Sequence, residues 1–340
     1  MTNDRVQLYG ITTPEAAPDV AAALAALWER RPEVIDAGPV AGIAGPVTGG
    51  ARPALSGRRA LGRHLHRLQR SWEVACQAGA FLPARAEVRA RDTAMLAGFL
   101  QRAAPSLAAS LGRFAGSHQW DISLAWEPVA MLRLLQARGA LQVSDDGDAA
   151  SAVKIALTRL RSDLITALRA AVMPYCHLAG DIKESGGDVE PALLLPLLVP
   201  AEETERVEAA LNALDNDWCG QLSIAMKGPQ PPLAFAAIGF AGPAPNRVRQ
   251  ARRRLSLPAR VDIAALKDAY RRMARALHPD HAGSQSSDAM AGLAESYRIL
   301  SDLAARQAEN GAAPGQLDCT RPEQARGLAV FDESGGRQAA

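Results

Sequence analysis

Three consecutive residues, His278, Pro279 and Asp280, combine groups that could act on a partner molecule. An imidazole and a carboxylate flank a proline, and a proline ends a helix because the residue before it is pushed out of the helical region. We therefore expect His278 and Asp280 to lie at an exposed turn. Basic residues at helical spacing precede this turn and would form one charged face: Lys267, Arg271, Arg272 and Arg275. Such a group is suited to binding an acidic surface.

Two amphipathic helices are expected to position this turn. Apolar residues recur at spacings of three and four on both sides of it, which places them on one face of each helix. Before the turn they are Leu266, Tyr270, Met273, Ala274 and Leu277. After it they are Met290, Leu293, Ala294, Tyr297 and Leu300. The two apolar stripes can pack against each other as an antiparallel hairpin.

Residues 266–301 closely resemble the J-domain, the module that recruits and stimulates DnaK-type ATPase chaperones. The resemblance covers helix II, the His-Pro-Asp turn and helix III, and residues 252–257 are similar to helix I and its Leu-Gly-Leu exit. Ser256 stands where glycine is usual. The resemblance implies that His278, Pro279 and Asp280 contact the ATPase partner, while Lys267, Arg271, Arg272 and Arg275 steer its approach.

Motifs of enzyme active sites are missing from the sequence. It contains no Gly-x-x-x-x-Gly-Lys loop, no Gly-x-Ser-x-Gly elbow and no His/Glu zinc pattern. The four cysteines, Cys76, Cys176, Cys219 and Cys319, are far apart and include no Cys-x-x-Cys pair. We therefore expect a binding protein that is not an enzyme, with reduced thiols, no cofactor and no metal.

Composition and charge are those of a globular protein. Hydrophobic residues make up 48% of the 340-residue chain, charged residues 22%, and the net charge is +2, so the whole chain does not favour nucleic acid or membrane. A local basic run at 247–260 leaves nucleic-acid binding as an alternative, but it has no interleaved aromatic residues. Without a signal peptide or an 18-residue apolar stretch, a soluble cytoplasmic protein is expected.

The rest of the chain mixes strand-like and helix-like segments. Strands are expected at residues 6–12, 34–47, 81–86, 119–127, 193–199 and 221–227. Helices are expected at residues 18–31, 58–76, 93–100, 106–114, 128–138, 149–172 and 202–214. The pattern predicts an α+β fold with two small ferredoxin-like or βαβ-type parts and a helical insert, followed by the all-α J-domain-like hairpin.

Prolines and one leucine stripe lead to three further expectations. Pro105 should separate the helices at 93–100 and 106–114. Pro196 indicates that the strand at 193–199 lies at a sheet edge, because proline cannot donate to the neighbouring strand. The heptad-like stripe in 149–172 is typical of a packed bundle helix, with a partner-binding coiled coil as the alternative.

A second resemblance extends over residues 6–240. The order strand, helix, strand before Gly228-Pro-Gln-Pro-Pro-Leu-Ala-Phe235 is similar to the C-terminal signature of the gas vesicle protein L/F (GvpL/GvpF) family. Leu-Tyr-Gly-Ile at 8–11, Phe-Leu-Pro-Ala-Arg at 81–85 and Trp-Asp-Ile-Ser-Leu at 120–124 also resemble that family, although Phe-Gly is missing after Arg85. The family is implicated in building the gas vesicle shell by binding the shell protein.

The two resemblances together predict the domain organisation. We expect an N-terminal α+β domain at 1–127, a helical segment plus a βαβ domain at 128–240, a proline-rich linker at 241–246, a J-domain at 247–308 and a disordered tail at 309–340.

The two resemblances together predict that the protein is a gas vesicle assembly factor. It would bind shell protein and other gas vesicle proteins and recruit a DnaK-type chaperone. It would not bind nucleic acid or membrane, and would be cytoplasmic and associated with the gas vesicle. The alternative is a minor structural component of the vesicle whose J-domain is vestigial or regulatory.

Overall fold

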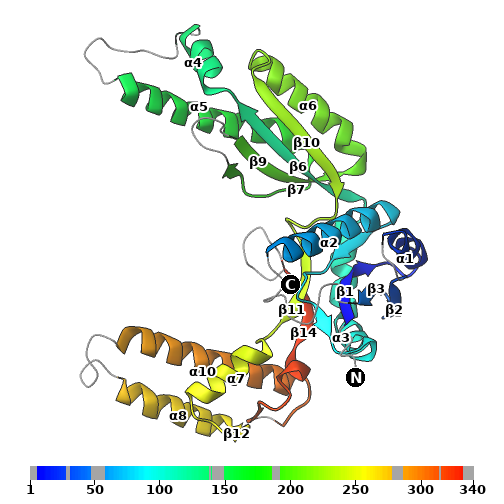
Figure 1. Ribbon diagram of the computed structural model, residues 1–340, viewed down its shortest axis with the longest axis vertical. Helices are drawn as coiled ribbons and strands as arrows, with labels where there is room; N and C mark the ends of the chain where they lie inside the picture. Colours follow the sequence, from blue (N-terminus) through cyan, green and yellow to red (C-terminus); the bar gives the residue numbers. More distant parts are fainter. Residues whose placement is uncertain are drawn as a thin grey trace. The chain divides into compact units, whose positions relative to one another are not determined.

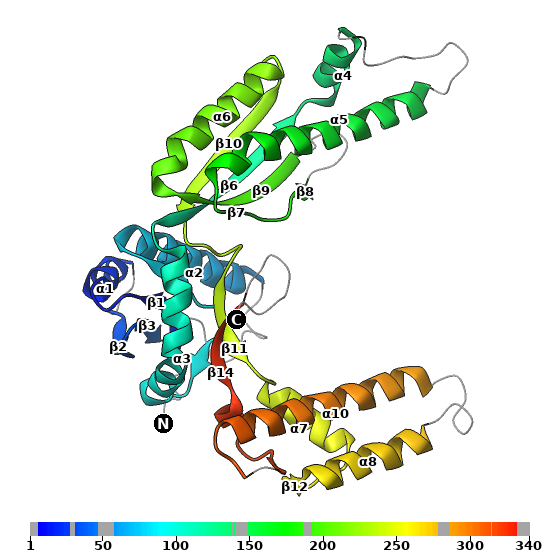
Figure 2. The ribbon, with the colours of Figure 1, turned by 180° about the vertical axis from the view of Figure 1, so that it is seen from behind.

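The computed structural model describes residues 6–27, 31–46, 58–137, 139, 149–185, 192–277, 286–313 and 315–331. The chain divides into two units, and each is described by itself. One contains residues 1–238 and 330–340, and the other contains residues 239–329 (Figures 1 and 2). None of the helices in the described ranges is long and apolar enough to cross a lipid bilayer.

The first sheet has a ferredoxin-like arrangement. Its elements are β1 (Val6–Thr12), α1 (Ala17–Ala25), β2 (Glu33–Asp36), β3 (Ala41–Pro46), α2 (Arg58–Ala78) and β4 (Phe81–Pro83). The strand order is β2-β3-β1-β4 with antiparallel neighbours, and β5 (Arg89–Ala90) also pairs with β1. A strand, helix, strand, strand, helix, strand sequence in this order is the split βαβ arrangement.

Helices cover both faces of β1, which explains why six of its seven residues are buried. On one face Tyr9 packs in a cluster with α1 and α2 that includes Val20 and Leu68. On the other face of the sheet α3 (Thr93–Phe114) brings Leu100 against Gly42 of β3, the strand next to β1. A Cβ added at Gly42 would lie 2.4 Å from the Leu100 side chain. Glycine at this position therefore permits the close packing of helix on sheet.

The α3 helix is continuous, so the expected break at Pro105 is wrong. Pro105 lies on the exposed side of α3, while buried residues continue on the inner side before and after it: Leu96, Leu100, Ala104, Leu107 and Leu111. An interior proline costs about 3 kcal/mol through a lost hydrogen bond and a steric clash. Burial of one uninterrupted apolar stripe offsets that cost.

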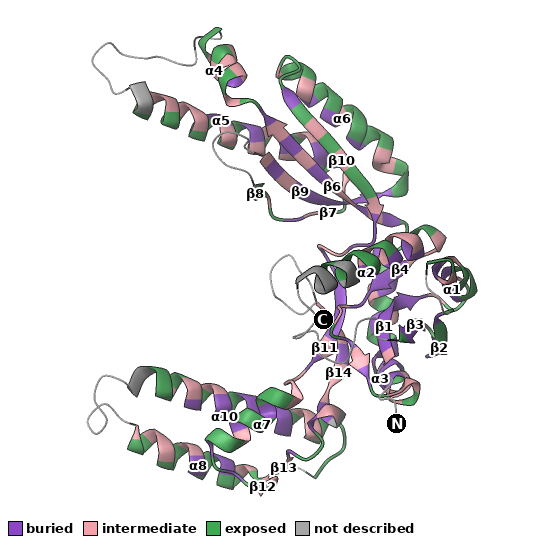
Figure 3. Ribbon diagram, in the orientation of Figure 1, coloured by how far each residue is buried: buried purple, intermediate pink, exposed green. Residues whose placement is uncertain are grey.

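The second sheet is antiparallel and carries two helices on one face. Its elements are β6 (Ser117–Trp126), α4 (Pro128–Ala137), α5 (Ala149–Val172), β7 (Leu178–Ala179), β8 (Lys183–Ser185), β9 (Ala192–Pro200), α6 (Thr204–Asp217) and β10 (Leu222–Gln230). The order is β10-β6-β9-β7, with β8 also paired to β9. Figure 3 shows that α6 is exposed along its outer side.

Two expectations for this sheet are corrected. Strand β6, assigned to the N-terminal domain at 1–127, pairs with β9 and β10 and so belongs to the second sheet. Strand β9 is an interior strand, because β6 lies on one side and β7 and β8 on the other. Pro196 lies between the residues of β9 that pair with β7 and those that pair with β8, so its missing N–H breaks no ladder there.

The leucine stripe of α5 packs inside its own unit. Leu160, Leu164, Leu168 and Val172 are buried in one core with β6, β9 and α6. This confirms the interpretation as a packed helix. A coiled coil with a partner would need the same residues, which are no longer accessible over this part of α5.

The second unit is mostly helical. Its helices are α7 (Pro245–Arg254), α8 (Ile263–Ala276) and α10 (Ser286–Glu309), with a short 3-10 helix, η4 (Pro322–Ala325). Strand β12 (Arg260–Asp262) pairs with β13 (Gln316–Asp318), and β11 (Ala237–Ala241) pairs with β14 (Gly327–Phe331). The expected linker at 241–246 is shorter than predicted, because α7 already begins at Pro245.

The expected disordered tail at 309–340 is also corrected for its described part. Leu317, Cys319, Ala325 and Leu328 are buried, and the first three pack in the core of the second unit. Apolar residues in a segment rich in Gly, Ala and Gln are too few to predict a core contribution from composition. Their burial depends on the helices they meet.

Candidate functional site

Helix α8 presents a basic face. Lys267, Arg271, Arg272 and Arg275 are all exposed, whereas Leu266 and Ala269 on the same helix are buried. Arg271 lies 3.8 Å from Asp268, and the other three have no ion-pair partner within the described residues. The structure therefore brings the four predicted basic residues together on one solvent-facing surface, which we call the α8 basic face.

Helix α8 packs on α10 through apolar side chains. The rings of Tyr270 and Tyr297 lie with centroids 4.8 Å apart, and Leu266 shares a core with Leu293 and Leu300. Aromatic rings at this separation stabilise the contact beyond the contribution of the apolar area that they bury. The pairing fixes which side of α8 faces solvent, and so holds the α8 basic face outward.

His278, Pro279 and Asp280 lie outside the described residues. The last described residue before them is Leu277, whose N–H donates to the carbonyl of Met273 at 3.0 Å at the end of α8. These three residues therefore follow the α8 basic face directly in the sequence. The structure leaves the roles predicted for these three residues untested.

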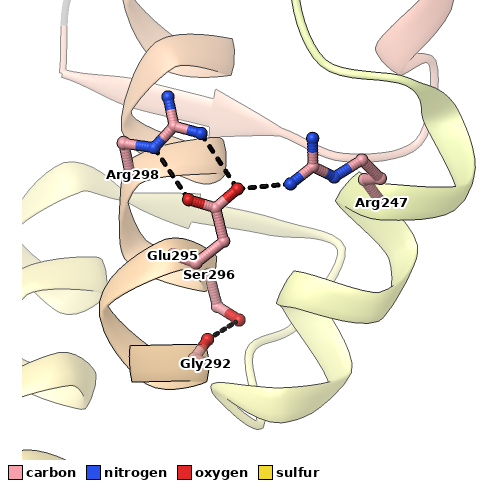
Figure 4. Close-up of polar contacts among 5 residues, drawn as sticks. All are labelled: Arg247, Gly292, Glu295, Ser296 and Arg298. Atoms are coloured by element: carbon pink, nitrogen blue, oxygen red, sulfur yellow. Dashed lines mark hydrogen bonds and ion pairs between the residues drawn. The ribbon is translucent and has the colours of Figure 1, made fainter. Parts of the chain in front are cut away.

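Helix α7 is joined to α10 by a carboxylate that sequence reasoning did not single out. Glu295 accepts from Arg298 of the same helix at 2.8 and 2.9 Å, and from Arg247 of α7 (Figure 4). Hydrogen bonds from Arg298, together with the charge of both guanidinium groups, hold the pKa of Glu295 below its ordinary value. A surface carboxylate between two arginines gave no distinctive signal in the sequence.

The end of α7 has the geometry that favours glycine, at the position where the sequence has Ser256. The N–H of Leu257 donates to the carbonyl of Arg252 at 3.0 Å, and that of Ser256 donates to Arg253 at 3.1 Å. These two bonds define a Schellman C-cap, whose residue after the cap adopts a left-handed conformation. Ser256 has φ of 51°, and Leu257 is buried as the motif requires.

The segment from Gly228 to Phe235 closes against β6 in the first unit. A Cβ at Gly228 would lie 2.6 Å from the Trp120 ring, so only glycine allows this approach. Gln119 donates to Asp121 at 2.8 Å and accepts from the N–H of Ala234 at 2.7 Å. The proline-rich segment is thus anchored to the strand that carries the Trp-Asp-Ile-Ser-Leu sequence.

A pocket of about 340 Å³ lies in the first unit and was not predicted. It is lined by the end of α2, the end of α3 and the start of β6, and its polar groups include Cys76, Ser117 and His118. Cys76 Sγ lies 3.3 Å from His118 Nδ1. The two residues are 42 positions apart, and no local spacing links them.

Comparison with known proteins gives one family. The model of the family "Gas vesicle synthesis protein GvpL/GvpF" matches residues 6–237. Among solved structures, the chain is similar to the gas vesicle protein GvpF from Anabaena sp. PCC7120, with TM-score 0.49 and 16% identity over 67% of this chain and 94% of that one.

GvpF from Microcystis aeruginosa is similar with TM-score 0.44 and 15% identity, over 67% of this chain and 97% of that one. A search of curated proteins found no match. The family match covers more than half of the chain and confirms the resemblance stated for residues 6–240. The chain belongs to the GvpL/GvpF family of gas vesicle synthesis proteins.

Proposed function

We propose that this protein is a gas vesicle assembly factor that binds gas vesicle shell protein and recruits a DnaK-type chaperone through a J-domain-like module. Family membership supports the gas vesicle part of the proposal. The α8 basic face, followed directly by His278, Pro279 and Asp280 in the chain, is the observation that supports the chaperone part.

The charge of the second unit agrees with an acidic partner. Residues 239–329 contain 14 Lys and Arg against 9 Asp and Glu, a net charge of +5 in a chain whose total is +2. Exposed charges of one sign raise the rate of association with an oppositely charged surface, and salt screens the effect. In this proposal the ATPase partner supplies the acidic surface.

A shell subunit is a suitable client for such a chaperone system. Proteins that assemble into a shell expose apolar faces and unpaired strand edges before assembly, and such surfaces aggregate. One chain that holds the client and also binds the ATPase raises the effective concentration of each near the other. The fusion of the two parts then serves delivery of the client.

Steady-state ATP hydrolysis by the host's DnaK-type chaperone tests the proposal. The full-length protein is compared with His278→Gln and with Lys267→Glu/Arg271→Glu, each with and without shell protein. A matched control, Lys154→Glu/Arg159→Glu, makes the same charge change on exposed residues of α5. We expect stimulation by the wild type and the control, at least tenfold weaker stimulation by the other two variants, and a further rise with shell protein.

The dependence of the defect on ionic strength distinguishes the charge-reversal variant from His278→Gln. The Lys267→Glu/Arg271→Glu defect should shrink as ionic strength rises, because screening removes steering. The His278→Gln defect should persist. Absence of stimulation by the wild type under all conditions would disprove the chaperone role. A stoichiometric, wash-resistant presence in purified vesicles would then favour a structural component.

A further inference from the structure

Strand β10 forms one edge of the second sheet. It is the end strand of the order β10-β6-β9-β7, and among the described strands it pairs with β6 alone. An edge strand presents a row of N–H and C=O groups to which a further strand can bond. β10 has nine residues, whereas β7 and β8 at the opposite edge have two and three. The β10 edge is therefore the longer of the two.

The backbone groups on the outer side of β10, away from β6, belong to alternate residues. The N–H of Leu222 donates to the carboxylate of Asp215 in α6 at 3.0 Å, so it points away from β6. Backbone groups of an antiparallel strand alternate between its two sides. The N–H and C=O groups of Ile224 and Met226 therefore also point outward, while the residues between them bond to β6. No strand of the described ranges lies on the outer side to bond them.

The features that block strand addition lie at one end of β10. They are the exposed Lys227, the register shift that follows it and Pro229. Charged side chains, bulges and prolines are the devices by which proteins prevent pairing at a sheet edge. Residues 222–226, Leu-Ser-Ile-Ala-Met, contain none of these devices. This part of the edge can therefore pair.

Helix α6 places carboxylates beside this part of the edge. Figures 1 and 2 show α6 running alongside β10. The bond from Leu222 marks the side of α6 that carries Asp215 as the one facing β10, and Glu208, seven residues earlier, shares that side. Glu208 and Glu205 are exposed and have no ion-pair partner within the described residues. Residues 202–217 contain six Asp and Glu residues and one Arg, so the charge beside the edge is negative.

These charges decide between two kinds of added strand. If β10 paired with β10 of a second copy, two acidic α6 helices would lie close together, and like charges in contact disfavour association. A segment with basic side chains would be attracted instead. Side chains of a strand alternate between the two faces of a sheet, so every second one would lie beside α6. The others would lie beside the small side chains of Ser223 and Ala225 on the opposite face.

We propose that the outer edge of β10 at residues 222–226 accepts an extended segment of a partner protein as an added strand. In this segment Lys or Arg alternates with apolar residues. Backbone hydrogen bonds to Ile224 and Met226 supply affinity, and the carboxylates of α6 select the basic side chains. The surface belongs to the first unit and does not involve the α8 basic face, so it is a binding site additional to the one proposed for the chaperone.

Fluorescence anisotropy with a labelled synthetic peptide of alternating Lys and Val tests the site on the full-length protein. We expect saturable binding of one peptide per chain, weakened by salt because opposite charges contribute to it. The same peptide with Glu in place of Lys should bind at least tenfold more weakly. No saturable binding of the Lys–Val peptide, or equal binding of the two peptides, would overturn the proposal.

Two variants remove the two parts of the site separately, and each should bind the Lys–Val peptide at least tenfold more weakly. Ile224→Pro removes an outward N–H and leaves the bonds to β6 in place. Its control is Ile224→Val, which keeps the N–H. Glu205→Lys/Glu208→Lys reverses the charge of α6, and Glu15→Lys/Asp19→Lys makes the same change on exposed residues near the start of α1. Both controls should bind as the wild type does.

Hydrogen exchange of the wild type does not depend on the variants folding. Peptide binding should slow exchange of the Ile224 and Met226 amides, which point outward. Exchange at Ser223 and Ala225 should stay unchanged, because their amides already bond to β6. Unchanged exchange of Ile224 and Met226 with the peptide bound would show that it binds elsewhere and would overturn the proposal.

Discussion

Ser256 shows how one residue can carry a backbone cost inside a well-formed motif. Its φ of 51° lies in the left-handed region, which costs an L-residue with a Cβ about 1–2 kcal/mol. The Schellman bonds from Ser256 and Leu257 hold it there. Glycine adopts this conformation without the penalty, and the J-domain resemblance has glycine at this position.

Ser256→Gly should therefore stabilise the second unit. The gain from relief of the left-handed penalty exceeds the greater entropy of glycine in the unfolded chain, so we expect about 0.5–1 kcal/mol. Thermal and urea denaturation of the full chain would measure it. Ser256→Ala keeps the Cβ and should give no gain; equal stabilisation by both changes would contradict the explanation.

Asp92 is a second residue with a defined local role, as the N-cap of α3. Its carboxylate accepts from the N–H of Met95 at 2.8 Å. This bond, together with the hydrogen bond and the charge of Arg91, lowers the pKa of Asp92 below its ordinary value. A lowered folded-state pKa means that the unfolded state binds more protons in acid, so the stabilisation is complete above the unfolded pKa and is lost as pH falls through the folded pKa.

Asp92→Asn keeps the cap without the charge and should change the acid dependence. The stability difference between wild type and Asp92→Asn should decrease as the pH falls from about 5 to about 3, near the carboxyl pKa. Urea denaturation at several pH values would measure it. Asp92→Ala loses the cap at every pH and is the control. A stability difference between wild type and Asp92→Asn that does not change with pH would contradict the assignment.

At the scale of elements, α2 shows that the apolar period alone does not decide burial. Leu68 is fully buried in the core with α1 and β1, whereas Leu65 on the same helix is 48% exposed. They are three positions apart, a spacing that places both on one side of a helix, yet only Leu68 is buried. The same substitution at the two positions therefore separates packing from helix propensity.

Leu68→Ala should destabilise the first unit by about 2–5 kcal/mol, because it leaves a cavity in a packed core. Leu65→Ala should change stability by less than about 0.5 kcal/mol, as expected at a surface position. Differential scanning calorimetry of the full chain would compare them. Similar losses at both positions would show that α2 does not pack as the structure has it.

At the scale of the whole molecule, the C-terminal segment completes the second unit. Leu317 is buried among the helices, and the Gln307 side chain bonds both backbone groups of Asp318, accepting from its N–H at 3.0 Å and donating to its carbonyl. Strand β14 then returns to pair with β11. The β11–β14 pair therefore joins the first and the last strand of this part of the chain.

A chain that stops at Asn310 should lose several kcal/mol of stability. Each buried leucine it lacks, Leu317 and Leu328 among them, contributes about 1.5–3 kcal/mol. Urea denaturation followed by circular dichroism would measure the loss, with a chain that stops at Phe331 as the control. Equal stability of the two chains would restore the expectation of a tail without a structural role.

The sequence alone determined the features that depend on neighbours along the chain. The apolar period predicted α2, α5, α8 and α10, and it predicted the α8 basic face because residues three and four apart share one side of a helix. The resemblance marked Ser256 as standing where glycine is usual, and the structure then showed its left-handed conformation. Motifs along residues 6–240 were sufficient to indicate the family.

Only the tertiary structure decided features that depend on distant pairings. Strand β6 joins the second sheet because its residues pair with β9 more than 60 positions later, from Ser117 with Pro200 to Ala125 with Ala192. Pro196 is tolerated inside that sheet because the ladder has a gap beside it. Cys76 meets His118 because α2 and β6 end and begin at one pocket, and local periodicity carries no information on such a meeting.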